Sequence, residues 1–302
     1  MKKIINSIKG LGMVMALVLA ACQSVAPADD HMLHILASTT FLADIAQNVA
    51  GDRVHIDSLL PFGSDPHAYQ AAPSDVARIA QSDLLILNGI EYEHFIEPLL
   101  ENAGGERLTV TASDGLEVNS MEEDGTQIGD PHMWLDPNRV ATYVENIRDG
   151  LIQLDPEGTE TYSTNAENYI SQLKELDAWI TEQVKQIPVE RRFLVTNHEA
   201  MGYFAERYGF TVSGAIIPSL SSDAGTSAQE MAALVDLIKS SGAPAIFLGE
   251  VENTDLADQI ADETGVRVVN DLYLESLTEG PPAATYIDMM KHNVMSILEA
   301  LK

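Results

Sequence analysis

Short apolar runs alternate with amphipathic stretches along residues 32–302. In the first half, the apolar runs predict strands near residues 33–38, 54–59, 84–88 and 108–112. Segments with apolar residues at helical spacing lie near 40–50, 74–82, 93–103 and 138–153. The second half repeats this order, with strands near 192–196, 211–217, 245–249 and 267–270 and helices near 199–208, 228–241, 255–264 and 285–301. Because such alternation is typical of parallel sheets covered by helices, we expect an α/β protein with two lobes, each a four-stranded, mostly parallel sheet flanked by helices.

The segment between the two halves has a different pattern. Its apolar residues recur at helical spacing and are Tyr162, Ala166, Tyr169, Ile170, Leu173, Leu176, Ile180 and Val184. A helix over residues 158–187 would be roughly 45 Å long, which favours one rigid helix joining the lobes over an ordinary surface helix with frayed ends. The predicted domains are therefore an N-terminal lobe (32–155), a linking helix (156–188) and a C-terminal lobe (189–302). The acidic loop 114–130 is the candidate for a mobile flap.

The N-terminus is typical of an export signal. Three lysines, at positions 2, 3 and 9, precede an apolar run over residues 11–21 that is too short to span a bilayer. The run ends in Leu19-Ala20-Ala21-Cys22, which resembles a bacterial lipobox and implies removal of residues 1–21 and acylation of Cys22. Residues 22–31 would form a tether that anchors the protein on the outer side of the cytoplasmic membrane. The alternative is an ordinary signal peptide with an incidental cysteine.

The amino-acid composition excludes several kinds of partner and of metal site. The chain has 302 residues, with 17 Lys and Arg against 46 Asp and Glu, a net charge of −29 and 45% hydrophobic residues. This is enough apolar material for a globular protein, and its negative surface argues against nucleic acid as a partner. A single cysteine excludes an internal disulfide, a four-cysteine zinc site and an iron–sulfur cluster. The same charge attracts cations, although acidity also serves solubility.

Histidine is the residue type that suggests chemistry. The sequence holds eight histidines, at positions 31, 34, 55, 67, 94, 132, 198 and 292. Two of them, His67 and His132, end a repeated Asp-Pro-His tripeptide, and each comes after a predicted strand. Proline restrains the backbone on either side, so that each imidazole leaves a stiffened chain. Asp65 and Asp130 could each accept a hydrogen bond from a ring N–H or a loop amide and so fix the tautomer.

A third histidine, His198, lies where a predicted strand ends and a helix begins. The positive end of a helix disfavours imidazolium, which leaves a ring nitrogen free to ligate. Because ligands bind outside the carboxyl ends of parallel strands, we expect His67, His132 and His198 to converge between the lobes. An isolated histidine at such a place is usually structural, but three at matching strand ends favour a metal site.

A carboxylate from the second lobe would complete four ligands. We expect Glu275, which follows the last predicted strand, to be this fourth ligand, and Asp271 and Glu250 are the alternatives. If Glu250 is not a ligand, we expect it, like Asp65 and Asp130, to contact the ligands from outside. The other histidines lack this context. His55, His94 and His292 are expected to be structural or surface residues, and His31 and His34 to lie near the flexible tether.

Several motifs now point to a family. Four of them are similar to motifs of the metal-binding lipoproteins of bacterial ABC importers for zinc and manganese (solute-binding protein family 9, cluster A-I). They are residues 61–69 (Pro-Phe-Gly-Ser-Asp-Pro-His-Ala-Tyr), Asn88-Gly89 followed by Glu91, residues 130–137 (Asp-Pro-His-Met-Trp-Leu-Asp-Pro), and His198 with Gly202-Tyr203-Phe204. The resemblance covers residues 33–302. It implies two lobes joined by one long helix, a metal held by the three histidines and an acid, and delivery of that metal to a membrane permease driven by an ATPase. It also implies a binding protein, expected to be monomeric, and not an enzyme.

Two departures from the family pattern bear on the metal. The family's acid is usually Asp, where this chain has Glu275, and the His-rich flap of many zinc members is absent. Three imidazoles with one carboxylate suit Zn²⁺ in tetrahedral geometry, and manganese members look to have Glu where this chain has His198. We therefore expect zinc, with Mn²⁺ or Fe²⁺ as alternatives, and an affinity that falls below about pH 6.5.

Two other functions remain open from the sequence. A zinc hydrolase would use three histidines to hold the metal and Glu199 or Glu275 to activate a water. However, the sequence has no His-Glu-x-x-His motif, nucleophile elbow or phosphate-binding glycine loop. A surface adhesin would also be anchored by a lipid, but no motif supports it.

Overall fold

The computed structural model describes residues 32–104, 106–123, 125–249, 252 and 254–302. Residues 33–302 form one compact unit, separate from residues 1–32. The predicted signal peptide and tether, Cys22, His31 and Glu250 lie outside the described residues. Within the described part, no helix is both long enough and apolar enough to cross a membrane.

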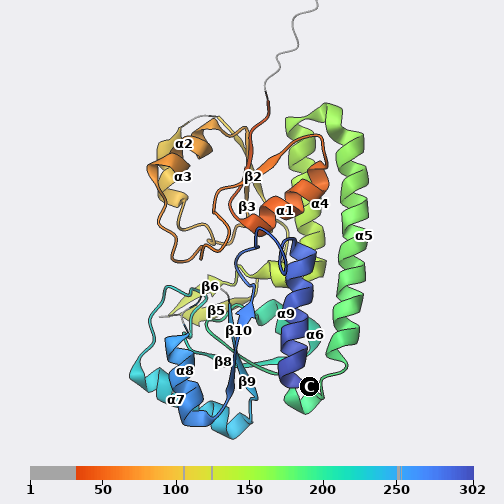
Figure 1. Ribbon diagram of the computed structural model, residues 1–302. Coiled ribbons are helices and arrows are strands. Elements are labelled where there is room, and N and C mark those ends of the chain that lie inside the picture. Colours follow the sequence, from red (N-terminus) through yellow and green to blue (C-terminus); the bar gives the residue numbers. More distant parts are fainter. Residues whose placement is uncertain (1–31, 105, 124, 250–251, 253) are drawn as a thin grey trace, which may run out of the picture. The chain divides into compact units, whose positions relative to one another are not determined.

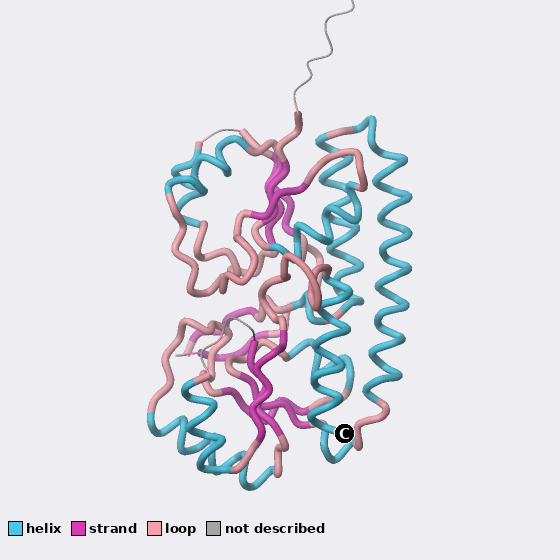
Figure 2. The backbone as a smooth tube through the Cα atoms, viewed as in Figure 1, coloured by secondary structure: helices cyan, strands magenta, loops and turns pink. Residues whose placement is uncertain are grey.

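Two four-stranded parallel sheets confirm the predicted fold class (Figures 1 and 2). The first has the order β2-β1-β3-β4, with β1 (Ile35–Ala37), β2 (Ile56–Ser58), β3 (Leu84–Leu87) and β4 (Leu108–Thr111). The second has the order β10-β9-β7-β8, with β7 (Phe193–Thr196), β8 (Thr211–Ala215), β9 (Ala245–Gly249) and β10 (Arg267–Leu272). Because the strands of each sheet are parallel, their carboxyl ends lie at the same edge of that sheet.

Helices flank the two sheets where the periodicity predicts them. In the first half they are α1 (Thr40–Ala50), α2 (Pro73–Gln81), α3 (Glu97–Ala103) and α4 (Pro137–Leu154). In the second half they are α6 (Gly202–Tyr208), α7 (Ala228–Ser241), α8 (Asp255–Thr264) and α9 (Tyr286–Leu301). Short 3-10 turns cover Met133–Leu135, Pro156–Gly158 and Val189–Arg191.

Two of these helices begin later than the periodicity predicts. Helix α3 starts at Glu97 because the side chain of Glu93 turns back to accept the backbone N–H groups of Asn88 and Gly89. Helix α6 starts at Gly202 because the N–H of Glu199 donates to the carbonyl of Ser219, 2.8 Å away, in the loop after β8. In both places tertiary hydrogen bonds replace the first helical turn.

The central helix α5 (Thr159–Val184) has 26 residues, and it contacts α1 and α4 as well as α6 and α9 (Figure 1). Its buried face consists of Tyr162, Ala166, Tyr169, Leu173, Leu176, Ile180 and Val184. At 1.5 Å per residue it is about 39 Å long. It therefore contributes to one core that is continuous from the first sheet to the second.

The loop over residues 114–130, the candidate for a mobile flap, contains an antiparallel hairpin that the sequence did not predict. Strands β5 (Ser120–Glu123) and β6 (Thr126–Gly129) pair in register, from Ser120 opposite Gly129 to Glu123 opposite Thr126. The polar, acidic composition hid this pair, because Met121 and Ile128, which lie opposite each other, are the only large apolar residues of the two strands. His132 consequently follows β6 and not β4.

Hydrogen bonds fix the chain after β10 against the first half of the molecule. The indole Nε1 of Trp134 donates to the carbonyl of Leu274 at 2.8 Å, and the N–H of Leu277 donates to Thr40 Oγ1 at 2.8 Å. The hydroxyl of Tyr286 donates to the carbonyl of Trp134 at 2.7 Å. These buried contacts hold residues 274–277 where Glu275 can meet groups from the first half.

Candidate metal centre

Four predicted side chains converge at one point. His67, His132, His198 and Glu275 each offer a donor atom, and these atoms all lie within 4.8 Å of one another. The Nε2 atoms of His132 and His198 are 3.3 Å apart. Glu275 Oε1 lies 3.5 Å from Nε2 of His198, 3.6 Å from that of His132 and 4.0 Å from that of His67. The predicted convergence of three strand-end histidines and one acid is thus present in the fold.

Each Asp-Pro-His tripeptide folds in the same local manner. The backbone N–H of His67 donates to Asp65 Oδ1 at 2.9 Å, and that of His132 donates to Asp130 Oδ1 at 2.9 Å. Asp130 Oδ1 also lies 2.8 Å from Nδ1 of His132, which directs Nε2 of that ring to the centre. Asp65 instead accepts the hydroxyl of Ser222 with its other oxygen, at 2.7 Å, and so connects the two halves of the site.

His198 has an acidic partner that the sequence reasoning missed. Its Nδ1 lies 2.8 Å from Glu252 Oε1, and the other oxygen of Glu252 accepts the N–H of Gly249. Both side chains are 1% exposed. The sequence signal was available, because Glu252 follows the predicted strand 245–249, but Glu250 was preferred at that edge. Glu250 lies outside the described residues, so its expected role stays a prediction.

Glu275 presents only one oxygen to the three histidines. Its second oxygen, Oε2, accepts the hydroxyl of Tyr92 at 2.7 Å, in a buried contact. Glu275 Oε1 and His67 Nε2 are both buried and make no hydrogen bond to any described residue. Because buried polar atoms are almost always paired, two such atoms facing each other at 4.0 Å indicate a missing cation.

The remaining candidates lie elsewhere. Asp271 is exposed and accepts the hydroxyl of Ser296, so it does not compete with Glu275. His55 and His94 are exposed beside Asp57 and Glu97, and His292 packs against Tyr273. None of these three histidines belongs to the cluster, as expected. His34 is exposed at the start of the described chain.

The environment of the cluster sets its protonation. Burial lowers the pKa of His67 to about 3. Burial alone would raise the pKa of Glu275, but its contacts with His198, His132 and His67 outweigh burial and lower that pKa to about 2. Burial would likewise lower the pKa of His198, but Glu252 and Glu275 outweigh it and raise the pKa to about 10. The sequence-based expectation of a neutral His198 at a helix start is therefore wrong for the metal-free protein, because α6 begins four residues later and two carboxylates flank the ring.

The donor set fits a transition metal. A tetrahedral ion bound at about 2.0–2.1 Å has neighbouring ligand atoms about 3.3–3.4 Å apart. The separations among His132 Nε2, His198 Nε2 and Glu275 Oε1, between 3.3 and 3.6 Å, are close to this length. His67 Nε2 is 4.0 Å from Glu275 Oε1, so the His67 ring would have to move slightly toward the other three donors.

Comparison with known proteins agrees with this geometry. Residues 35–300 match the family model described as ZnuA, zinc-uptake complex component A, periplasmic. The chain belongs to this family. It is 37% identical over 294 residues to the manganese-binding lipoprotein MntA of Halalkalibacterium halodurans, with 96% of each chain covered. It is 30% identical to the metal ABC transporter substrate-binding lipoprotein SsaB of Streptococcus sanguinis, covering 97% of this chain and 99% of that one.

Among solved structures, the fold is similar to the periplasmic zinc-binding protein TroA from Treponema pallidum. The TM-score is 0.82 at 30% identity, covering 89% of this chain and 99% of TroA. The family consists of solute-binding proteins of ABC transporters, which is a class of binding proteins and not of enzymes.

Glu252 provides a direct test of how the centre is built. In Glu252→Ala, the ring of His198 loses the partner that orients it, and we expect the affinity for Zn²⁺ to fall about 10- to 100-fold. Calorimetric titration measures this, with Glu263→Ala as the matched control, because Glu263 is an exposed acid in the same half of the chain. Equal affinities for the two variants would contradict the orienting role of Glu252.

Proton release provides a second test. At pH 7 the metal-free site holds a proton on His198, whose pKa is about 10, and a metal must displace it to bind Nε2. We expect zinc binding to release at least one proton at pH 7 and the apparent affinity to fall about tenfold per pH unit from 8 to 6. Calorimetry in buffers of different ionisation enthalpy measures the released protons. Binding without net proton release would show that His198 is neutral beforehand.

Proposed function

We propose that this protein captures Zn²⁺ outside the cytoplasmic membrane and delivers it to an ABC permease for import. The observation that carries the proposal is the buried cluster of three imidazole nitrogens and one carboxylate oxygen, contributed by both halves of the molecule. Membership of a family of solute-binding proteins supports transport as the purpose of this binding. His67, His132, His198 and Glu275 are the proposed ligands, and the protein is proposed to act as a monomer with a permease and an ATPase as partners.

The choice of zinc rests on the donors. Nitrogen-rich sets of four suit zinc, whereas manganese prefers more oxygen and more ligands. Tyr92 occupies the second oxygen of Glu275, so the carboxylate supplies one donor atom instead of two. The relatives support different metals: MntA is named as manganese-binding and TroA as zinc-binding. Mn²⁺ and Fe²⁺ are therefore the alternatives that an experiment must separate from zinc.

Affinity alone does not separate them, because most sites bind Zn²⁺ more tightly than Mn²⁺ or Fe²⁺. The test is elemental analysis of the purified protein together with X-ray absorption of the loaded form. We expect zinc with four nitrogen or oxygen ligands at about 2.0–2.1 Å. In His132→Ala, tight zinc binding should weaken by more than about 100-fold while the metal-free fold persists. The exposed His55→Ala serves as control. Five or six ligands, or manganese or iron in the purified protein, would contradict the choice of zinc.

The proposed location depends on Cys22. The sequence Leu19-Ala20-Ala21-Cys22 resembles a lipobox, and relatives such as MntA and SsaB are named as lipoproteins. We expect the native protein to lack residues 1–21, to carry a diacylated Cys22 and to fractionate with membranes. Mass spectrometry of the mature N-terminus checks this. Cys22→Ser should release the protein from the membrane fraction, and a variant that stays with the membrane would contradict anchoring through this residue.

A further inference from the structure

The four proposed ligands differ in how far solvent can reach them. The side chains of His132, His198 and Glu275 are 0%, 1% and 1% exposed, whereas that of His67 is 9% exposed. A hydrated ion cannot meet the first three without crossing protein. The point of access to the centre therefore lies on the side of His67.

A cavity of about 600 Å³ opens on that side. We call it the His67 cavity; it is lined by His67 and Tyr92 from the first half, by Ile128 and Gly129 of β6, and by Ser221 and Asp223 after β8. His67 is the only one of the four ligands that lines it. Tyr92 also lines it and donates to Glu275, so the cavity and the metal centre share a wall.

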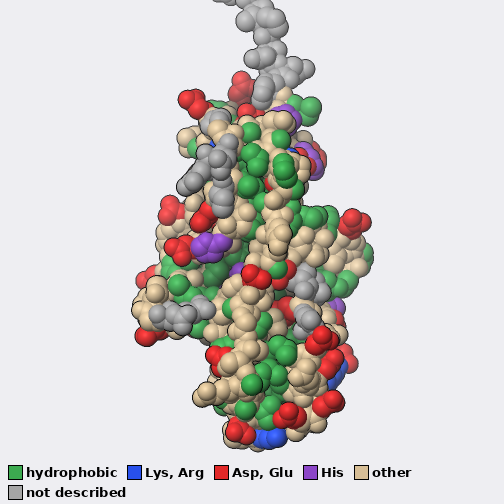
Figure 3. Space-filling view, turned by 90° about the vertical axis from the view of Figure 1, so that its left-hand side faces the viewer, with side chains coloured by type: hydrophobic (Ala, Val, Ile, Leu, Met, Phe, Trp, Pro, Cys, Tyr) green, Lys and Arg blue, Asp and Glu red, His purple; other side chains and the backbone are tan. Residues whose placement is uncertain are grey.

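The polar groups at the cavity rim suit a cation. Glu91, His94 and Asp223 are exposed there, and the described lining residues include no lysine or arginine. Figure 3 faces this side of residues 33–302 and shows histidine and acidic side chains gathered at mid-height. Negative groups at the mouth of a cleft raise the local cation concentration and the rate of association.

The wall that carries Tyr92 is held in an uncommon conformation. Ile90 and Glu91 both have φ of 57°, in the left-handed region that non-glycine residues rarely adopt. The buried carboxylate of Glu93 holds this turn by accepting the N–H groups of Asn88 and Gly89. Such strain persists only where surrounding contacts fix it, and here it places Glu91 at the rim and Tyr92 at the inner end.

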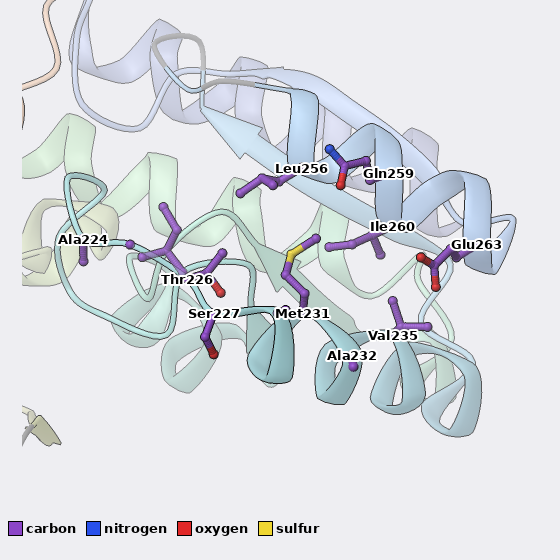
Figure 4. A pocket seen from close by; sticks show the side chains of 13 residues that line it. Ala224, Thr226, Ser227, Met231, Ala232, Val235, Leu256, Gln259, Ile260 and Glu263 are labelled. Atoms are coloured by element: carbon purple, nitrogen blue, oxygen red, sulfur yellow. The ribbon is translucent and has the colours of Figure 1, made fainter.

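A second cavity offers a comparison. It has a volume of about 520 Å³ and lies between α7 and α8, where Met231 and Val235 face Leu256 and Ile260 (Figure 4). None of the four ligands lines it. Size alone therefore does not distinguish the His67 cavity; its contact with a ligand and its acidic rim do.

We infer that the metal enters and leaves the centre through the His67 cavity and that His67 is the first ligand it meets. This inference rests on the proposed function. The ion passes Glu91, His94 and Asp223 and reaches the exposed part of the His67 ring; a small rotation of the ring then brings its buried Nε2 to the ion, which exchanges its remaining water for the deeper donors.

The test obstructs the cavity and measures both rate constants. In Ser221→Trp, an indole would fill the space beside His67, and a path blocked in both directions slows entry and exit equally. We expect the association and dissociation rate constants for Zn²⁺ to fall together, by about tenfold or more, with the equilibrium constant unchanged. Stopped-flow mixing with a fluorescent zinc chelator measures both. Ile128→Trp repeats the obstruction from the opposite wall, and Ala232→Trp, in the cavity of Figure 4, is the matched control.

Two further comparisons sharpen the result. Glu91→Gln with Asp223→Asn should slow association by a few-fold and weaken its salt dependence, with dissociation nearly unchanged. His67→Ala should lower the association rate constant, whereas His132→Ala should mainly raise the dissociation rate constant.

The outcomes separate the inference from the proposed function. A wild-type protein that binds no zinc would overturn the proposed function. If the wild type binds zinc and both tryptophan variants keep wild-type rate constants, the entry route is wrong and the function stands. A change in the equilibrium constant without matched changes in both rates would also overturn the route.

Discussion

Glu275 Oε1 lies within 4.0 Å of a nitrogen from each of three histidines, in a place that water hardly reaches. Removing an ionised carboxylate from water is costly unless positive charge compensates for it. In the metal-free protein that charge is the proton on His198; in the loaded protein it is the metal. The site is thus built to hold a cation at all times, and metal binding is an exchange of a proton for a metal ion.

This constraint explains how the two halves of the molecule are joined. A centre with ligands from both sheets requires the loop after β10 to hold its position to within a fraction of an ångström. The hydrogen bonds from Trp134 to Leu274 and from Leu277 to Thr40 provide that precision, and α5 packs against helices of both halves. Outer partners then direct two of the rings, with Asp130 behind His132 and Glu252 behind His198.

Most of the fold and of the candidate site could be predicted from the sequence, because the patterns that indicate them are local in the chain. Apolar runs revealed all eight strands of the two sheets, because buried parallel strands leave a strong signal. The ends of parallel strands placed His67, His198 and Glu275 on one side of the two sheets, whereas His132 reaches the same point after the antiparallel hairpin. The hairpin at 120–129 could not be found, because each strand has a single large apolar residue, Met121 or Ile128, which is too few for a period-two pattern. The role of Glu252 was missed because Glu250 and Glu252 both follow the predicted strand 245–249, and no periodicity distinguishes them.

The hydrogen bond from Tyr92 to Glu275 affects how many oxygen atoms Glu275 can offer to a metal. A carboxylate can supply one oxygen or two, and the difference changes a four-coordinate site into a five-coordinate one. By occupying Oε2, Tyr92 limits Glu275 to a single donor, although glutamate is long enough to approach the ion with both oxygens. Burial raises the pKa of Tyr92 well above its ordinary value, so the hydroxyl stays a donor at any physiological pH. If Glu275 is a ligand as proposed, Tyr92 would favour binding through one oxygen without touching the metal itself, from a turn whose conformation Glu93 maintains.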